Sequence, residues 1–148
     1  MDSQEALTLS SLILATAGGL VDRINTGVAA RGFDDVRPAH GFAFTRIAGG
    51  GATAGELAEH LGVTKQAASQ LVDELVRKEY VERRPHPDDA RARLVVLTER
   101  GRACTRAAED AAAEAIAPWR DALGEQRLRA LREDLARIAP NGRLRPTW

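Results

Sequence analysis

Residues 57–75 read Leu-Ala-Glu-His-Leu-Gly-Val-Thr-Lys-Gln-Ala-Ala-Ser-Gln-Leu-Val-Asp-Glu-Leu, and this stretch decides the fold. Its first part turns Leu57, Ala58 and Leu61 to one side of a short helix, and Gly62 follows where a helix C-terminus favours glycine. A second helix begins almost at once. Two helices joined by a short turn that contains glycine predict a helix-turn-helix, whose second helix enters the major groove of DNA.

The second helix is predicted over residues 65–78, and its outer face carries hydrogen-bonding side chains. Four residues form its apolar stripe, namely Ala68, Leu71, Val72 and Leu75. Lysine can bond guanine, glutamine can pair with adenine, and serine or threonine can contact bases or phosphates. A recognition helix meets base edges with its N-terminal turns, so five residues there are predicted to bind DNA. These five are Thr64, Lys65, Gln66, Ser69 and Gln70. Thr64 has a second interpretation, in which it only caps the helix.

Two strand-like runs, 80–84 and 93–97, enclose a charged loop that contains prolines, which predicts a hairpin beside the second helix. Such a basic loop can reach the neighbouring minor groove, where arginine is favoured, and Arg91 is the predicted inserted side chain. Asp89 is predicted to accept from the guanidinium of Arg91 and to orient it. Three further residues are predicted phosphate contacts, namely Arg83, Arg84 and Arg93.

The flanking segments have the spacing of long helices with wide apolar faces. One is predicted over 5–31, with Gly18-Gly19 marking either a bend or a close helix contact. Pro38 is suited to the first position of a helix that ends near Ala48. After the hairpin, helical spacing returns over 99–140, with Pro118 a possible bend. The prediction is a mainly α (α+β) winged helix in a single domain, residues 1–148. Its lobe spans 38–98, and 5–31 and 99–140 are dimerisation helices.

Composition narrows the classes of function. The chain has 148 residues and zero formal net charge, but residues 64–106 hold ten Lys and Arg against seven Asp and Glu. Residues 1–63 hold four against seven, so the predicted DNA-binding part is the basic part. No signal-peptide pattern is recognised and no apolar run approaches the roughly 20 residues that span a bilayer. We therefore expect a soluble, cytoplasmic protein with no membrane partner.

These residues resemble the MarR family of bacterial transcription regulators. The resemblance rests on the run 57–75, on 80–83, and on 89–101, where Asp-x-Arg is followed by Leu-Thr-x-x-Gly. The match in residue type covers about 38–101, and the flanking helices match in layout only. Many relatives carry a second arginine where Ala90 stands, so the resemblance implies a weaker wing here.

The resemblance implies a homodimeric repressor in which the terminal helices of two chains interlock. Two recognition helices would then lie one DNA turn apart on a palindromic operator. Many relatives are released from DNA by small aromatic or lipophilic ligands bound between the dimer helices and the DNA-binding lobe. The ligand of this chain is unknown, and no cofactor is expected.

The same residues allow other interpretations of function. The helix-turn-helix can serve as a protein-interaction module that never binds DNA, or as the dimerisation part of an enzyme whose catalytic domain lies elsewhere. No catalytic motif is recognised, so an enzyme is not expected. Cys104 is either a redox-sensing thiol or a buried small residue. His60 is predicted to be exposed, His86 to lie on the wing, and His40 in the core or a pocket. None of these histidines has a metal-ligand set.

Overall fold

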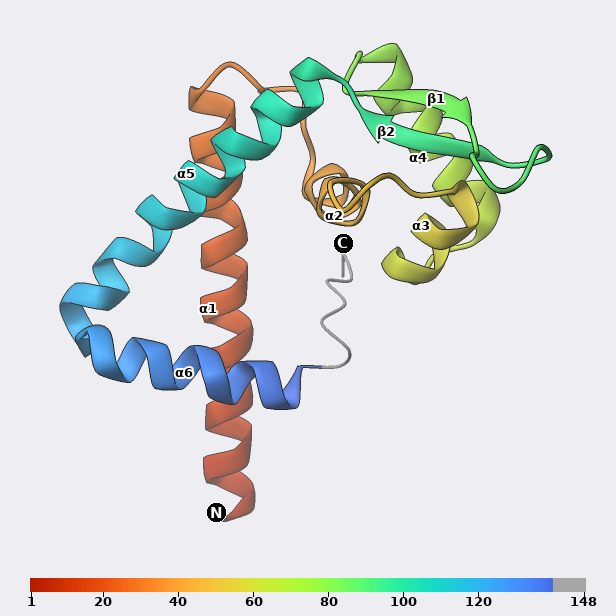
Figure 1. Cartoon of the computed structure of the whole chain (residues 1–148). Coiled ribbons are helices and arrows are strands. Elements are labelled where there is room, and N and C mark those ends of the chain that lie inside the picture. The colour runs from red at the N-terminus through yellow and green to blue at the C-terminus, as the bar shows by residue number, and fades with distance from the viewer. Residues whose placement is uncertain (140–148) are drawn as a thin grey trace.

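The computed structural model describes residues 1–139, and over that range the fold is six helices and one antiparallel pair of strands (Figure 1). The elements are α1 (Ser3–Ala30), α2 (Pro38–Ile47), α3 (Ala54–Leu61), α4 (Lys65–Arg77), β1 (Val81–Pro85), β2 (Arg93–Leu97), α5 (Glu99–Leu123) and α6 (Glu125–Ile138). The predicted mainly α winged-helix fold is confirmed. Residues 140–148, which include the last position of the predicted range 99–140, lie outside the described residues.

Helices α2 to α4 and the two strands form a lobe from which the β1–β2 loop projects away from the long helices (Figure 1). α1 packs along α5, and α4 packs against α3 and β1. At Gly27 α1 approaches α5 closely, because an added Cβ would lie 2.7 Å from the Cβ of Ala111. α5 begins directly after β2, so the wing and a long helix are continuous in the chain.

Local capping signals fix the helix-turn-helix. The hydroxyl of Thr53 accepts from the amide of Glu56 at 3.1 Å, and that of Thr64 accepts from the amide of Ala67 at 3.1 Å. Between them Gly62 ends α3 with φ at 68°, a left-handed conformation that favours glycine. The two helices bury a shared apolar side, namely Leu57, Ala58, Leu61, Ala68, Val72 and Leu75.

The hairpin pairs Val81 with Leu97 and Pro85 with Arg93. An isolated bridge from Ala52 to Val95 ties the segment before α3 to the second strand. Val81, Val95 and Leu97 are buried, so one side of the wing belongs to the lobe core. The outer half of the hairpin is therefore supported by a core that also holds α4.

The N-terminal helix differs from expectation in two ways. α1 runs as one helix through Gly18-Gly19, and nothing lies within 4 Å of a Cβ added at either, so the close helix contact predicted there is not seen among the described residues. α1 is also long and apolar enough to cross a membrane by length and composition alone, with a mean hydropathy of 1.3 over an 18-residue window. The expectation that no apolar run approaches bilayer length was wrong, because Thr and Ser lower the hydropathy of this helix only slightly.

Candidate nucleic-acid interface

The outer face of α4 is polar and open. Thr64, Lys65, Gln66 and Gln70 are exposed, and Ser69 is half-buried. Within residues 1–139 the side chains of Lys65, Gln66 and Gln70 have no hydrogen-bond or ion-pair partner, whereas Thr64 caps the helix. The cap does not occupy the second lone pair of its hydroxyl. Four long or hydroxylated side chains at the N-terminal end of α4 are thus available to a ligand outside the chain.

Asp89 orders the wing loop through the backbone. Its carboxylate accepts from the amide N–H of Arg91 at 2.9 Å, and its carbonyl accepts from the amide of Ala92 at 3.1 Å. The predicted bond from the guanidinium of Arg91 to Asp89 is not formed. The physical reason is local, because an aspartate side chain readily accepts from the amide N–H two residues later and closes an Asx turn. The guanidinium of Arg91 is left exposed and without a partner in the described chain.

The three predicted phosphate contacts fall in different surroundings. Arg83 forms an ion pair with Asp73 on the outer side of α4, so it lies beside the recognition helix. Arg84 forms an ion pair with Glu82. Because successive strand residues point to opposite faces of a hairpin, Arg84 faces away from the side that Arg83 occupies. It lines a cavity of about 410 Å³ together with Arg102 and other residues of α5. Arg93 is exposed, and no partner is found for it within residues 1–139.

Arg77 was missed in the sequence analysis. It is exposed in the last turn of α4 and has no partner among the described residues. Helical spacing of seven and eleven from Gln70 and Gln66 places all three along one outer strip of the helix. The spacing is visible in the sequence, but the prediction considered only the N-terminal turns of the helix, and Arg77 lies in its last turn.

The histidines and the cysteine are settled by burial. His40 is fully buried, in agreement with the core interpretation, and His86 accepts from the amide of Asp88 at 3.1 Å on the wing. The prediction for His60 was wrong, because its Nε2 is buried and has no hydrogen-bond partner. Burial raises the pKa of the Cys104 thiol to about 11, which opposes thiolate formation. No group of three metal-binding side chains occurs within residues 1–139.

A largely apolar cavity of about 420 Å³ lies between α1, α2 and α5. Its walls include Ile24 of α1, Phe42 and Phe44 of α2, and Ala108 of α5. The aromatic rings come from α2, the helix of the lobe that packs on both α3 and α5. A cavity of this volume and lining suits a small apolar molecule.

The comparisons with known proteins agree with this geometry. Residues 37–92 match the model of the MarR family. RV1404 from Mycobacterium tuberculosis is 26% identical, with a TM-score of 0.73 over 97% of this chain and 99% of that chain. Residues 37–92 thus match the MarR family, and the fold is similar to that of solved MarR structures. The apo form of wild-type MarR from E. coli has a TM-score of 0.70 at 25% identity, covering 89% of this chain and 97% of that chain.

A second MarR structure carries DNA. A mutant MarR from E. coli complexed with operator DNA is 25% identical, with a TM-score of 0.73 over 95% of this chain and all of that chain. No curated protein matches the sequence significantly. This chain therefore has the fold of MarR-family transcription regulators, and the MarR fold is one that has been solved on an operator.

Proposed function

We propose that this protein is a member of the MarR family and a homodimeric transcription regulator that binds DNA sequence-specifically. The observation that carries the proposal is the open outer face of α4, together with the exposed guanidinium of Arg91 on the wing loop. Arg83 links that face to the wing by its ion pair with Asp73. Polar side chains that find no partner in the chain are suited to base edges, and arginines beside them are suited to phosphates and the minor groove.

The apolar surface of α1 supports the dimer. Leu7, Leu12 and Leu14 are 69%, 60% and 74% exposed, and Ile138 of α6 is 72% exposed. Large apolar side chains exposed to this extent are costly in water, and a second copy of the chain would cover them. A two-fold pair of chains then requires an operator with matching two-fold symmetry, with half-sites about one helical turn apart.

We further propose that the protein is a cytoplasmic repressor released by a small aromatic or lipophilic effector in the cavity between α1, α2 and α5. Phe42 and Phe44 supply ring surfaces for such a molecule, and movement of α2 reaches the lobe directly. No enzymatic activity is part of the proposal. A membrane-spanning role is not part of it either, since a second copy of the chain would cover the apolar face of α1.

Fluorescence anisotropy tests the proposal, with duplexes selected by the wild-type protein from a random pool. The wild type is expected to prefer the selected duplex to a scrambled one. Gln70→Ala should lose ~1–3 kcal/mol of that discrimination, while Gln126→Ala on α6 should lose none. Arg91→Ala should weaken binding where the minor groove is narrow.

Failure would be plain at low salt. If no duplex is retained at about 50 mM salt, where phosphate contacts are strongest, the DNA-binding proposal is wrong. Stoichiometric capture of one protein partner under the same conditions would instead favour a protein-interaction module.

A further inference from the structure

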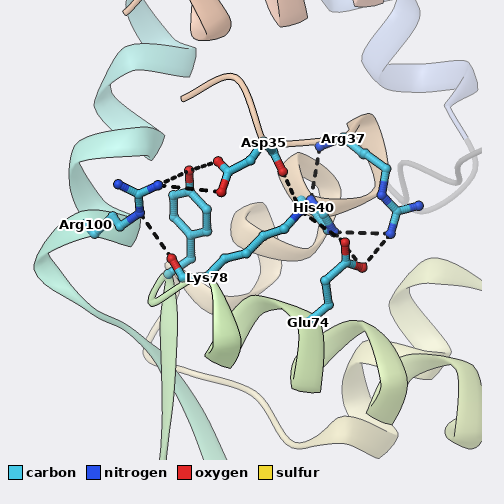
Figure 2. A network of polar contacts seen from close by, with 7 residues as sticks. Asp35, Arg37, His40, Glu74, Lys78 and Arg100 are labelled. Atoms are coloured by element: carbon cyan, nitrogen blue, oxygen red, sulfur yellow. Dashed lines mark hydrogen bonds and ion pairs between the residues drawn. The ribbon is translucent and has the colours of Figure 1, made fainter. Parts of the chain in front are cut away.

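Glu74 lies on one flank of α4 and joins it to α2 (Figure 2). Its carboxylate accepts from the guanidinium of Arg37 at 2.6 Å and from the ammonium of Lys78 at 3.1 Å. The Nε2 atom of His40 lies 3.3 Å from the same carboxylate. One carboxylate on the recognition helix thus meets two groups from α2 and its N-cap.

The imidazole of His40 is a fixed, neutral part of this cluster. Its Nδ1 accepts from the amide N–H of Arg37 at 3.0 Å, so the ring proton of the neutral form lies on Nε2 and faces Glu74. The side chain is fully buried, and burial lowers the pKa of His40 despite the carboxylate beside it. A buried polar ring with both nitrogens occupied holds its neighbours in one arrangement.

The cluster continues to the long helix α5 (Figure 2). The ammonium of Lys78 donates to the carbonyl of Asp35 at 2.6 Å, and the hydroxyl of Tyr80 donates to the Asp35 carboxylate. Arg100, in the first turn of α5, donates to the hydroxyl of Tyr80 at 3.1 Å and to the carbonyl of Lys78 at 3.1 Å. The C-terminal end of α4 is therefore tied both to the segment before α2 and to α5.

The opposite flank of α4 is held by Asp73, which pairs with Arg83 of the wing. Asp73 and Glu74 are adjacent in sequence and about 100° apart around the helix. Between the two flanks runs the outer strip that includes Gln66 and Gln70. Apolar packing alone leaves a scatter of about 15–20° in the angle at which a helix crosses its neighbours. Ion pairs at both flanks therefore restrict the orientation of α4.

We propose that Glu74, held by Arg37 and His40, is a positioning residue that sets the direction in which the recognition helix presents its outer strip to DNA. This inference rests on the proposed function. Glu74 comes one turn after Gln70 on the helix, so loosening its flank turns the side chains that read bases. DNA recognition is expected to depend on a carboxylate whose own contacts are all within the protein.

The experiment compares Glu74→Gln with wild type on a selected duplex and on a scrambled one. Loss of positioning is expected to reduce affinity for the selected duplex by roughly 2- to 30-fold, the range typical of coupling between sites. Removal of a negative charge favours DNA of any sequence, so affinity for the scrambled duplex is expected to hold or rise. The ratio of the two affinities therefore falls, which a general loss of folded protein would not produce.

Two controls make the test specific. Glu82→Gln removes the same charge from the wing without touching α4, and it should leave the ratio of the two affinities unchanged. Gln70→Ala should cost less discrimination in the Glu74→Gln background than in wild type, because Gln70 is then misdirected. A role confined to stability would leave that cost unaltered.

If folded Glu74→Gln keeps both the discrimination and the full cost of Gln70→Ala, the positioning role is overturned. If Glu74→Gln does not fold, Arg37→Ala breaks the same ion pair from a side chain that is 60% exposed. Loss of its positive charge lowers affinity for DNA of any sequence, so the ratio of the two affinities and the cost of Gln70→Ala then decide. If wild type itself binds no duplex, the proposed function fails first, and the two failures are distinguished.

Discussion

Gly101 lies in the first turn of α5 against the connection between α4 and β1, and substituting it tests how the long helix is seated on the lobe. A Cβ added at Gly101 would lie 2.1 Å from the carbonyl oxygen of Tyr80 and 3.1 Å from a methyl group of Leu97. The carbonyl cannot move freely, because it accepts from the amide of Thr98 at 3.0 Å. An ordinary contact therefore requires a backbone shift of more than 1 Å.

The magnitude follows from that shift. Overpacking of a buried site typically costs ~1–3 kcal/mol, and the upper end applies where the obstructing atom is a hydrogen-bonded backbone oxygen. Gly101→Ala should then lower Tm by about 10 °C, at roughly 2–4 °C per kcal/mol for a chain of this size. Gly41→Ala is the matched control, because Gly41 lies inside α2 with nothing within 4 Å of an added Cβ. It should stabilise the protein by up to ~1 kcal/mol through helix propensity.

Differential scanning calorimetry of the two variants beside wild type measures the opposite shifts. The reasoning would be refuted if Gly101→Ala melted within 2 °C of wild type, as estimated from the same scaling. Equal shifts of the same sign in both variants would also refute it, since only Gly101 abuts the backbone of Tyr80.

Three further outcomes are expected. Burial would raise the pKa of Glu74, but hydrogen bonds from its neighbours lower it to about 2 from 4.5, and the pKa of His40 lies below 6.5 because of burial. The unfolded chain therefore binds more protons, so urea melts should show stability falling below pH 6.5 and again between 4.5 and 2. Glu74→Gln should show a smaller second decline, since the lowered pKa of Asp35 also contributes to it. Leu12→Asp should sediment as a 15.9 kDa chain while Leu12→Met keeps twice that mass, and equal masses would contradict the proposed interface. The Cys104 thiol should resist Ellman's reagent at pH 8 until urea unfolds the chain, and immediate labelling would show that it is accessible.

Local signals explain which parts of the fold were predictable. Thr64 and Gly62 act within one helical turn, so the bounds of α3 and α4 follow from neighbouring residues. The hairpin follows from alternation between two turn-bearing segments. The same alternation implies that Arg83 and Arg84 face opposite sides of the hairpin. The prediction that both contact phosphates did not take this into account.

Long-range pairing explains what was missed. The carboxylate of Glu74 meets His40 across 34 positions of sequence, and no local pattern indicates which α2 residue would face it. Asp89 was assigned the right partner residue but the wrong atom, since the choice between guanidinium and backbone amide depends on the conformation of the loop. The burial of the His60 Nε2 depends likewise on what packs over α3.

The central claim is that the outer strip of α4 and the guanidinium of Arg91 bind the same face of a DNA duplex, and that each chain of a dimer makes these contacts at one of two half-sites. Hydroxyl-radical footprinting on a selected duplex, with wild type and Arg91→Ala in parallel, tests it most directly. The account predicts two protected segments about one helical turn apart, each flanked by a minor-groove protection that Arg91→Ala alone removes. A single protected segment, or flanking protections that persist in Arg91→Ala, would contradict it.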